Sequence, residues 1–190
     1  QIMTEGHYSQ LPVVDSDNKL IGLVTEKLLA EVNPSSATSL SVYEINYLLS
    51  KTKVQDIMKT GIFKINKDAL IEDAAIIMKE NRISSLPVVE GDNYLAGIIT
   101  RTDIFKAFID IMGVKATGTR IAITTEDKVG VLADITSILA QHNINIRNIT
   151  DISENGKSEI TIKVRSLDAT AAVEDINAKG YNVTSVITVH

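Results

Sequence analysis

The apolar and polar positions in the first part of the chain form a pattern that occurs twice. Residues 3–14 and 78–89 align at a shift of 75 positions, and both segments end in Leu-Pro-Val-Val. The same shift continues through a turn rich in Asp and Asn into an aliphatic stretch, at residues 19–24 in one copy and 94–99 in the other. Each copy therefore predicts the end of a helix, a short buried strand, a turn, a second strand and a helix, which is an α/β unit.

The second copy has further elements ahead of this core. Residues 54–58 predict a turn of helix and residues 62–65 predict a strand, and Asp68 can cap the amphipathic helix that follows. Shifted back by 75 positions, the counterparts of these elements fall before Gln1. We therefore expect the first copy to lack about twenty residues in this sequence.

A helical insertion separates the two copies. Residues 33–39 are rich in Ser and predict a loop. Ser39 can then cap a helix that carries the apolar residues Leu40, Tyr43, Tyr47 and Leu48.

The pattern changes after residue 118. We predict a strand at residues 120–124, a helix at 129–141, a strand at 143–152, a hairpin turn at Asn155-Gly156, a strand at 159–164, a helix between Asp168 and Gly180, and a strand at 181–189. This β-α-β-β-α-β order is the ferredoxin-like arrangement.

The expected fold class is therefore mixed α/β (α+β), in two domains joined by a linker. The predicted boundaries are residues 1–113 for the repeat pair (repeat one 1–32, helical insertion 33–50, repeat two 51–113), 114–118 for the linker, and 119–190 for the ferredoxin-like domain.

Composition excludes several kinds of chemistry. The absence of Cys removes disulfides, Fe–S clusters, thiolate zinc sites and thiol nucleophiles, and the three His stand far apart in the sequence. The net charge of −5 argues against a nucleic-acid partner, because such proteins usually carry a basic face. No apolar run approaches the roughly 18 residues of a membrane span. We therefore expect a cytoplasmic protein with no metal site and no membrane partner.

Two motifs connect these domains to known families. The repeated Pro-Val-Val, acidic turn, Gly-containing strand and following Thr resemble, over residues 1–112, a pair of CBS domains, which bind adenosyl compounds in clefts between the copies. Residues 127–132 resemble the D-x-P-G-x-L motif of ACT domains, with Val129 in place of Pro, and Asn145-Ile146 matches the start of their second strand. A CBS pair followed by an ACT domain resembles the acetoin-utilization (AcuB) family, and ACT domains sense amino acids.

The resemblance to CBS domains places a nucleotide site in the second copy. Asp103 can accept two hydrogen bonds from a ribose cis-diol, and the Thr100 hydroxyl and free helix N–H groups can bind sugar or phosphate oxygens. The alternative is that Thr100 and Asp103 only form a helix capping box. Repeat one has Thr25 but Leu28 in place of the Asp, so one site looks intact and the other degenerate.

Further residues complete the expected nucleotide site. Basic side chains would neutralise phosphates and aliphatic ones would contact the adenine; the alternative is that they are ordinary surface charges and core strand residues. The expected nucleotide-binding set is Thr60, Ile62, Arg82, Ile83, Ser84, Leu86, Pro87, Thr100, Arg101 and Asp103.

The resemblance to ACT domains places an amino-acid site at the first strand–helix junction. The N–H groups of Gly130, Val131 and Leu132 would hold a ligand carboxylate, Asp127 would meet the α-ammonium, and the Asn145 amide would contact both, where two copies of the domain meet. The alternative is that Asp127 caps the helix and Asn145 merely begins a strand.

These features predict a non-enzymatic, ligand-sensing regulatory protein with no tightly bound cofactor, an adenosine nucleotide and an amino acid as regulatory ligands, and an unidentified regulated protein. We expect a homodimer at least. One alternative is a dimerisation module with vestigial sites. Another alternative is a hydrolase or transferase that uses Asp103 with Asp127 or Glu126. The sequence offers such an enzyme no paired base, no Cys and no phosphate-binding Gly loop.

Overall fold

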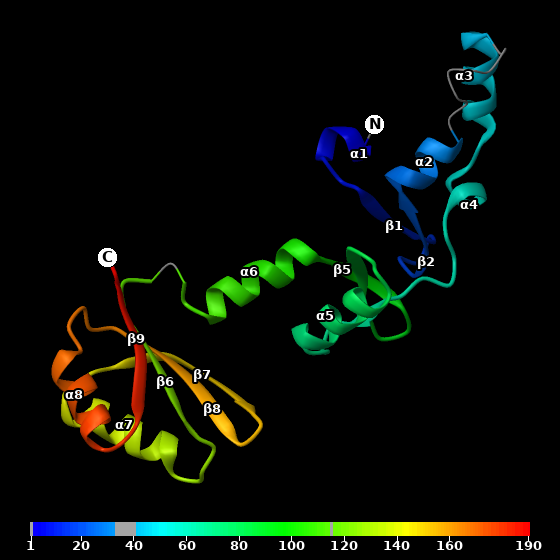
Figure 1. Ribbon diagram of the computed structural model, residues 1–190. Helices are drawn as coiled ribbons and strands as arrows, with labels where there is room; N and C mark the ends of the chain where they lie inside the picture. The colour runs from blue at the N-terminus through cyan, green and yellow to red at the C-terminus, as the bar shows by residue number, and fades with distance from the viewer. Residues whose placement is uncertain (1, 33–40, 115) are drawn as a thin grey trace. The chain divides into compact units, whose positions relative to one another are not determined.

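The computed structural model describes residues 2–32, 41–114 and 116–190 of the chain (Figure 1). The fold divides into two compact units, Gln1–Phe105 and Lys106–His190. The division falls inside one helix, α6 (Arg101–Ile111).

The first unit contains both repeats. Repeat one has α1 (Ile2–Gly6), the antiparallel strands β1 (Gln10–Val14) and β2 (Leu20–Thr25), and α2 (Glu26–Val32). The helix α3 (Val42–Lys51) precedes repeat two. Repeat two has α4 (Val54–Ile57), β3 (Ile65–Asn66), α5 (Ile71–Glu80), β4 (Ser85–Glu90), β5 (Tyr94–Thr100) and the start of α6. The α/β repeat predicted from the sequence is confirmed.

Two of the expected helix caps differ in the structure. The N-terminal cap of α5 is Leu70, whose N–H donates to the Asp73 carboxylate at 3.3 Å, whereas Asp68 lies before it. For α3, the Glu44 N–H donates to the Ser41 hydroxyl at 3.4 Å and the Ser41 N–H donates to the Glu44 carboxylate at 2.8 Å, as in a capping box. The loop at 33–39, with its proposed cap Ser39, and Leu40 lie outside the described residues.

The core of repeat two lies between its sheet and α5. The sheet has the order β3-β4-β5, with β3 parallel and β5 antiparallel to β4. Ile65, Ala74, Met78 and Leu86 are buried together. The predicted strand at 62–65 is shorter in the structure, where only Ile65 and Asn66 pair with β4.

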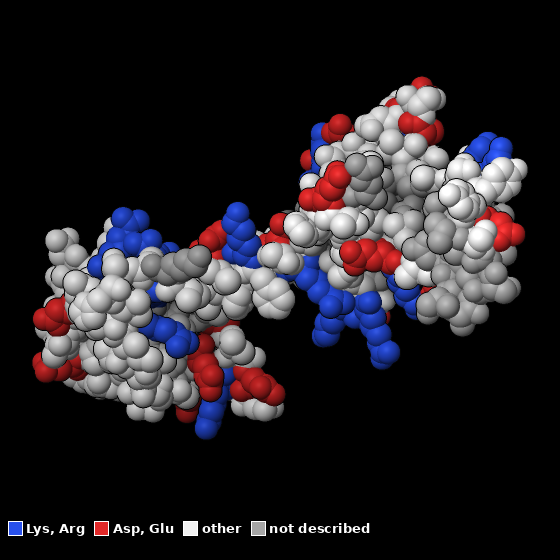
Figure 2. All heavy atoms as spheres, turned by 90° about the horizontal axis from the view of Figure 1, so that it is seen from above, with Lys and Arg blue, Asp and Glu red and all other residues white. Residues whose placement is uncertain are grey.

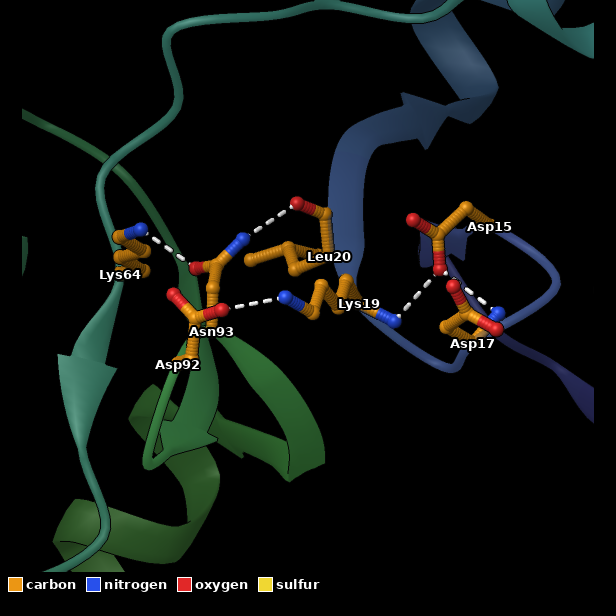
Figure 3. Close-up of polar contacts among 7 residues, drawn as sticks. All are labelled: Asp15, Asp17, Lys19, Leu20, Lys64, Asp92 and Asn93. Carbon is orange, nitrogen blue, oxygen red and sulfur yellow. Dashed lines mark hydrogen bonds and ion pairs between the residues drawn. The ribbon is translucent and has the colours of Figure 1, made fainter.

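The turns of the two repeats contact each other in a nearly symmetrical way. The Asn93 side chain donates to the Leu20 carbonyl at 2.6 Å (Figure 3). The equivalent Asn18 side chain donates to the Leu95 carbonyl at 3.2 Å. The backbone pairs match as well, since the Leu20 N–H donates to Asn93 and the Leu95 N–H donates to Asn18, both at 2.9 Å. Both Asn residues have positive φ, 62° and 71°, which Asn tolerates better than most residues. The 75-residue shift is thus an internal pseudo-twofold relation.

Polar side chains add contacts that this symmetry does not repeat. Lys19 forms an ion pair with Asp92, and Lys64 donates to the Asn93 side chain (Figure 3). The hydroxyl of Ser85 donates to Gln10 at 2.6 Å. The Lys19–Asp92 and Ser85–Gln10 contacts join residues 73 and 75 positions apart, so the two repeats form a single structural unit.

The second unit has the predicted β-α-β-β-α-β order. Its elements are β6 (Gly118–Glu126), α7 (Val131–Gln141), β7 (Ile146–Glu154), β8 (Lys157–Val164), α8 (Thr170–Ala178) and β9 (Asn182–Val189). The sheet is antiparallel throughout, in the order β7-β8-β6-β9. Both helices pack on one face of it (Figure 1), over a core that includes Ile121, Ile135, Leu139, Ile160, Ile162 and Ile176.

The other face of this sheet contacts the end of α6. Ile162 and Val164 face the core, so Lys163 between them points to the opposite side. Although it is a lysine, Lys163 is only 6% exposed, and its ammonium donates to the carbonyls of Gly113 at 2.6 Å and Val114 at 3.3 Å. These carbonyls follow the C-terminus of α6, where a cation is favourable. The last turn of α6 is thus held on the sheet.

Candidate functional site

Thr100 and Asp103 lie where β5 passes into α6. The Asp103 carboxylate accepts hydrogen bonds from the Thr100 N–H at 2.8 Å and from the Thr100 hydroxyl at 2.6 Å. The Asp103 N–H donates back to the Thr100 hydroxyl at 3.3 Å. This is a capping box, and the Asp103 side chain is exposed to solvent.

The equivalent helix of repeat one shows that a cap can form without a carboxylate. There the Leu28 N–H donates to the Thr25 hydroxyl at 3.2 Å, so the helix is capped by Thr without a carboxylate. The carboxylate of Asp103 is therefore the chemical difference between two otherwise equivalent helix starts.

The structure separates Arg82 and Arg101 from Asp103. On an α-helix, two residues of separation rotate the side chain by about 200°, so Arg101 and Asp103 lie on nearly opposite sides of α6. Arg101 donates from Nε to the Ile83 carbonyl at 3.1 Å. Together with Arg82 it lines a cavity of about 360 Å³ between α5 and α6. Asp103 does not line that cavity.

The other predicted nucleotide-site residues are placed in three ways. Thr60 is exposed, and Ile62, Ile83 and Ser84 are half-buried. Leu86 and Pro87 are fully buried, and neither presents a surface to a ligand in this conformation.

Gly22 and Gly97, equivalent residues of the two repeats, differ in their surroundings. A Cβ at Gly22 would lie 2.6 Å from Met58 Sδ and 2.9 Å from the Lys59 carbonyl oxygen. The Lys59 backbone pairs with Leu23 of β2 in both directions at 2.9 Å. Gly22 therefore accommodates the chain's own backbone, whereas Gly97 faces open space.

A second cavity lies at the start of α7. It has a volume of about 470 Å³ and is lined by Thr125, Glu126, Lys128, Val129, Gly130, Val131, Asp134, Gly180 and Tyr181. Gly130 is the N-terminal cap of α7, with φ of 96°, and its carbonyl accepts from the Asp134 N–H at 2.9 Å. The helix therefore begins at Val131 rather than at Val129, and Asp127 is not its cap.

Two of the lining residues, Asp134 and Tyr181, form a pair that was not predicted from the sequence. The Tyr181 hydroxyl donates to Asp134 at 2.7 Å, and the Lys179 ammonium lies 2.9 Å from the other Asp134 oxygen. The hydrogen bonds from Lys179 and then Tyr181 lower the pKa of Asp134, and the bond to Asp134 raises the pKa of Tyr181. Their pairing spans 47 residues of sequence, so local patterns carry no signal for it.

The predicted amino-acid site is only partly assembled within one copy. Gly130 and Val131 line the cavity, while Asp127 and Leu132 do not. The Asn145 carbonyl accepts from the Arg165 N–H at 2.9 Å, beside the Val164–Thr119 pair at the far end of β6. That end is about 23 Å along the strand from Glu126. A ligand that touches both Asn145 and this cavity must therefore lie between two copies.

The described residues contain no cluster of three or more His, Cys, Asp or Glu side chains that could hold a metal ion. Within the same residues, no helix is long and apolar enough to cross a membrane. Basic and acidic side chains are both present on the surface of each unit (Figure 2).

Comparison with known proteins covers both units. The CBS domain family model matches residues 1–33 and 54–110, and the ACT domain model matches residues 119–181. The CBS domain-containing protein CBSX1 of Arabidopsis thaliana is 34% identical over 128 residues, 58% of this chain and 54% of that protein. The chain thus spans little more than half of this relative. Protein MJ1426 of Methanocaldococcus jannaschii, which has no assigned function, is 30% identical over 131 residues, 57% of this chain and 78% of that protein.

Two solved structures resemble this chain with TM-scores below 0.5. CBSX2 in complex with AMP is 30% identical, covers 58% of this chain and 78% of its own, and gives a TM-score of 0.48. A Vibrio cholerae protein assigned to acetoin utilization (AcuB) is 25% identical, with coverage of 60% and 77% and a TM-score of 0.46. With the two family matches and the relative from M. jannaschii, the chain belongs to the CBS-domain family and consists of a tandem CBS pair followed by a C-terminal ACT domain.

Proposed function

We propose that this chain is a non-enzymatic, ligand-sensing regulatory protein. Its CBS pair binds an adenosyl nucleotide of the AMP, ATP or S-adenosylmethionine type, and its ACT domain binds an amino acid or similar small acid. The observation that carries the proposal is the solvent-exposed carboxylate of Asp103 at the N-terminus of α6. Because Thr25 caps the equivalent helix without a carboxylate, Asp103 is an acceptor group that repeat two has and repeat one lacks.

The chemistry at Asp103 suits a ribose. A carboxylate accepts hydrogen bonds from both hydroxyls of a cis-diol, and bonds to a charged acceptor are stronger than neutral ones. On binding, the diol takes the place of the Thr100 hydroxyl as a donor to the carboxylate. Thr100 then remains available to cap the helix as Thr25 does.

The ACT domain offers a polar cavity for a small zwitterion. The N-terminus of α7 presents N–H groups that favour a carboxylate. The proposed site joins this cavity and Asp127 of one copy to Asn145 of another, so the protein acts as a homodimer at least. The mass measured by light scattering at micromolar concentration tests the assembly, and a monomer mass would contradict it.

Substitution of Asp103 tests the nucleotide site. Asp103→Asn keeps the shape but loses the charged acceptor, and we expect it to weaken nucleotide binding by about 1 to 3 kcal/mol. Calorimetric titration with AMP, ATP and S-adenosylmethionine measures this loss. Asp110→Asn, on the same helix and also exposed, is the matched control. Equal affinities in wild type and Asp103→Asn would remove Asp103 from the site.

A second candidate function is a dimerisation module with vestigial sites. It is favoured by the hydrogen bonds that already occupy Asp103 and Asp134 within the chain. A thermal-shift panel of nucleotides and amino acids separates the two functions, because a ligand that binds only the native state raises the melting temperature. The resemblance to the acetoin-utilization family is the basis for proposing that the regulated process is acetoin utilization.

A further inference from the structure

The side chain of Gln10, the first residue of β1, reaches from repeat one to repeat two. Its amide nitrogen donates to the Ser84 hydroxyl at 2.8 Å, and its amide oxygen accepts from the Ser85 hydroxyl at 2.6 Å. The nucleotide-binding set expected from the sequence contains no residue of repeat one. Gln10 is therefore a contact between the repeats that the expected site does not include.

This contact lies beside the helix start that carries Asp103. Ser85 pairs with Thr100 in the antiparallel ladder of β4 and β5, and such partners have Cα atoms about 4.5 to 5.5 Å apart. The Ser84 carbonyl accepts from the first N–H of α6 at 3.0 Å. Because the Asp103 carboxylate accepts from the Thr100 N–H, both Gln10 and Asp103 contact residues at the junction of β5 and α6.

The bond between Gln10 and Ser84 leaves hydrogen-bond donors for a ligand. A hydroxyl has one hydrogen to donate, and a primary amide has two N–H groups. The Ser84 hydroxyl is the acceptor of this bond, so its own hydrogen and the second N–H of Gln10 can donate to a third group. Both side chains are half-buried, so they are accessible from solvent. Two adjacent donors suit an anionic oxygen, and they offer no favourable contact to a sulfonium cation.

We propose that Gln10 is a specificity-determining residue of the nucleotide site in repeat two. Its amide and the Ser84 hydroxyl bind the 5′-phosphate of a nucleotide whose ribose is held by Asp103. This inference rests on the proposed function and narrows its ligand to a nucleoside 5′-phosphate, in preference to S-adenosylmethionine. A single ligand then contacts side chains of both repeats.

Adenosine and AMP differ only in the 5′-phosphate, so calorimetric titration of both into the full chain measures what this group contributes to binding. We expect the wild type to bind AMP at least tenfold more tightly than adenosine or S-adenosylmethionine, because charge-assisted hydrogen bonds form. Gln10→Glu keeps an oxygen that accepts from Ser85 but replaces the amide donor with a negative charge. It should weaken AMP binding at least tenfold and change adenosine binding less than twofold.

Gln55→Glu makes the same change of charge at an exposed position of α4 and is the matched control, which should leave both affinities unchanged. Ser84→Ala removes the second donor and should also reduce the preference for AMP over adenosine. If Gln10→Glu leaves the ratio of the two affinities as in the wild type, Gln10 is only a structural contact between the repeats, and the proposal is overturned. Equal binding of AMP and adenosine by the wild type would overturn it as well.

Failure of the proposed function itself gives a different result. In that case neither AMP nor adenosine binds the wild type, or Asp103→Asn leaves both affinities unchanged, and the inference about Gln10 fails with it. If Asp103→Asn weakens both ligands while Gln10→Glu weakens neither, the nucleotide site stands and only the role of Gln10 is refuted.

Discussion

Lys163 provides a direct measure of how firmly α6 is attached to the ACT sheet. Lys163→Ala removes two hydrogen bonds from a charged donor to the carbonyls of Gly113 and Val114. Each such bond contributes about 1.5 to 3 kcal/mol net, and part of this is offset because the variant no longer buries an ammonium group. We therefore expect the free energy of unfolding of the C-terminal unit to fall by about 2 to 4 kcal/mol.

The assay is urea unfolding of the full chain, combined with native-state hydrogen exchange of residues 111–114. Lys163→Met keeps the aliphatic stem and separates the lost charge from the lost packing. Lys157→Ala is the control, because Lys157 is exposed on the same strand and should change stability by about 0.5 kcal/mol or less. If Lys163→Ala unfolds at the same urea concentration as Lys157→Ala and residues 111–114 exchange no faster, the attachment contributes nothing and the reasoning fails.

Two further predictions concern acid stability and a close backbone approach. Folding lowers the pKa of Asp134, chiefly through Lys179, so the contribution of this carboxylate to stability is complete above the ordinary carboxyl pKa and is lost as pH falls through the lowered value. Asp134→Asn should therefore reduce the loss of stability at acid pH in a profile of urea midpoints measured between pH 7 and pH 2. A profile identical to that of the wild type would contradict the assignment. Gly22→Ala should cost about 1 to 3 kcal/mol because its Cβ would collide with the Lys59 carbonyl, whereas Gly97→Ala should be nearly neutral. Equal urea midpoints for these two variants would refute that account.

The fold could be predicted because its signals are local or repeated. The 75-residue shift identified the two repeats before any contact was known. In the C-terminal unit, Asn155-Gly156 marked the hairpin and Gly180 marked the end of α8, and both glycines have positive φ, 75° and 97°. These residues specify backbone conformation on their own, so no tertiary information was needed.

The site was harder to predict because its residues meet through tertiary contacts. Tyr181 and Asp134 form a hydrogen bond across 47 residues of sequence, and no local sequence pattern predicts such a pair. The separation of Arg101 from Asp103, in contrast, can be predicted from the sequence. Helical periodicity places residues two positions apart on nearly opposite sides of α6, so Arg101 and Asp103 do not belong to one nucleotide site. Asn145 follows the same logic, because β6 and β7 run in the same direction and their starts lie together, far from the loop that follows β6.

The hydrogen bonds that the Asn side chains form between the two repeats have a consequence for folding kinetics. The bonds of Asn18 and Asn93 join residues 77 and 73 positions apart, so the contacts between the sheet of repeat one and repeat two form only after a long loop has closed. A two-stranded sheet such as β1-β2 has little stability alone. The CBS pair should therefore fold in one cooperative transition of high contact order, and amide protection in repeat one should fall in step with protection in repeat two, even when the destabilising change lies in only one of them.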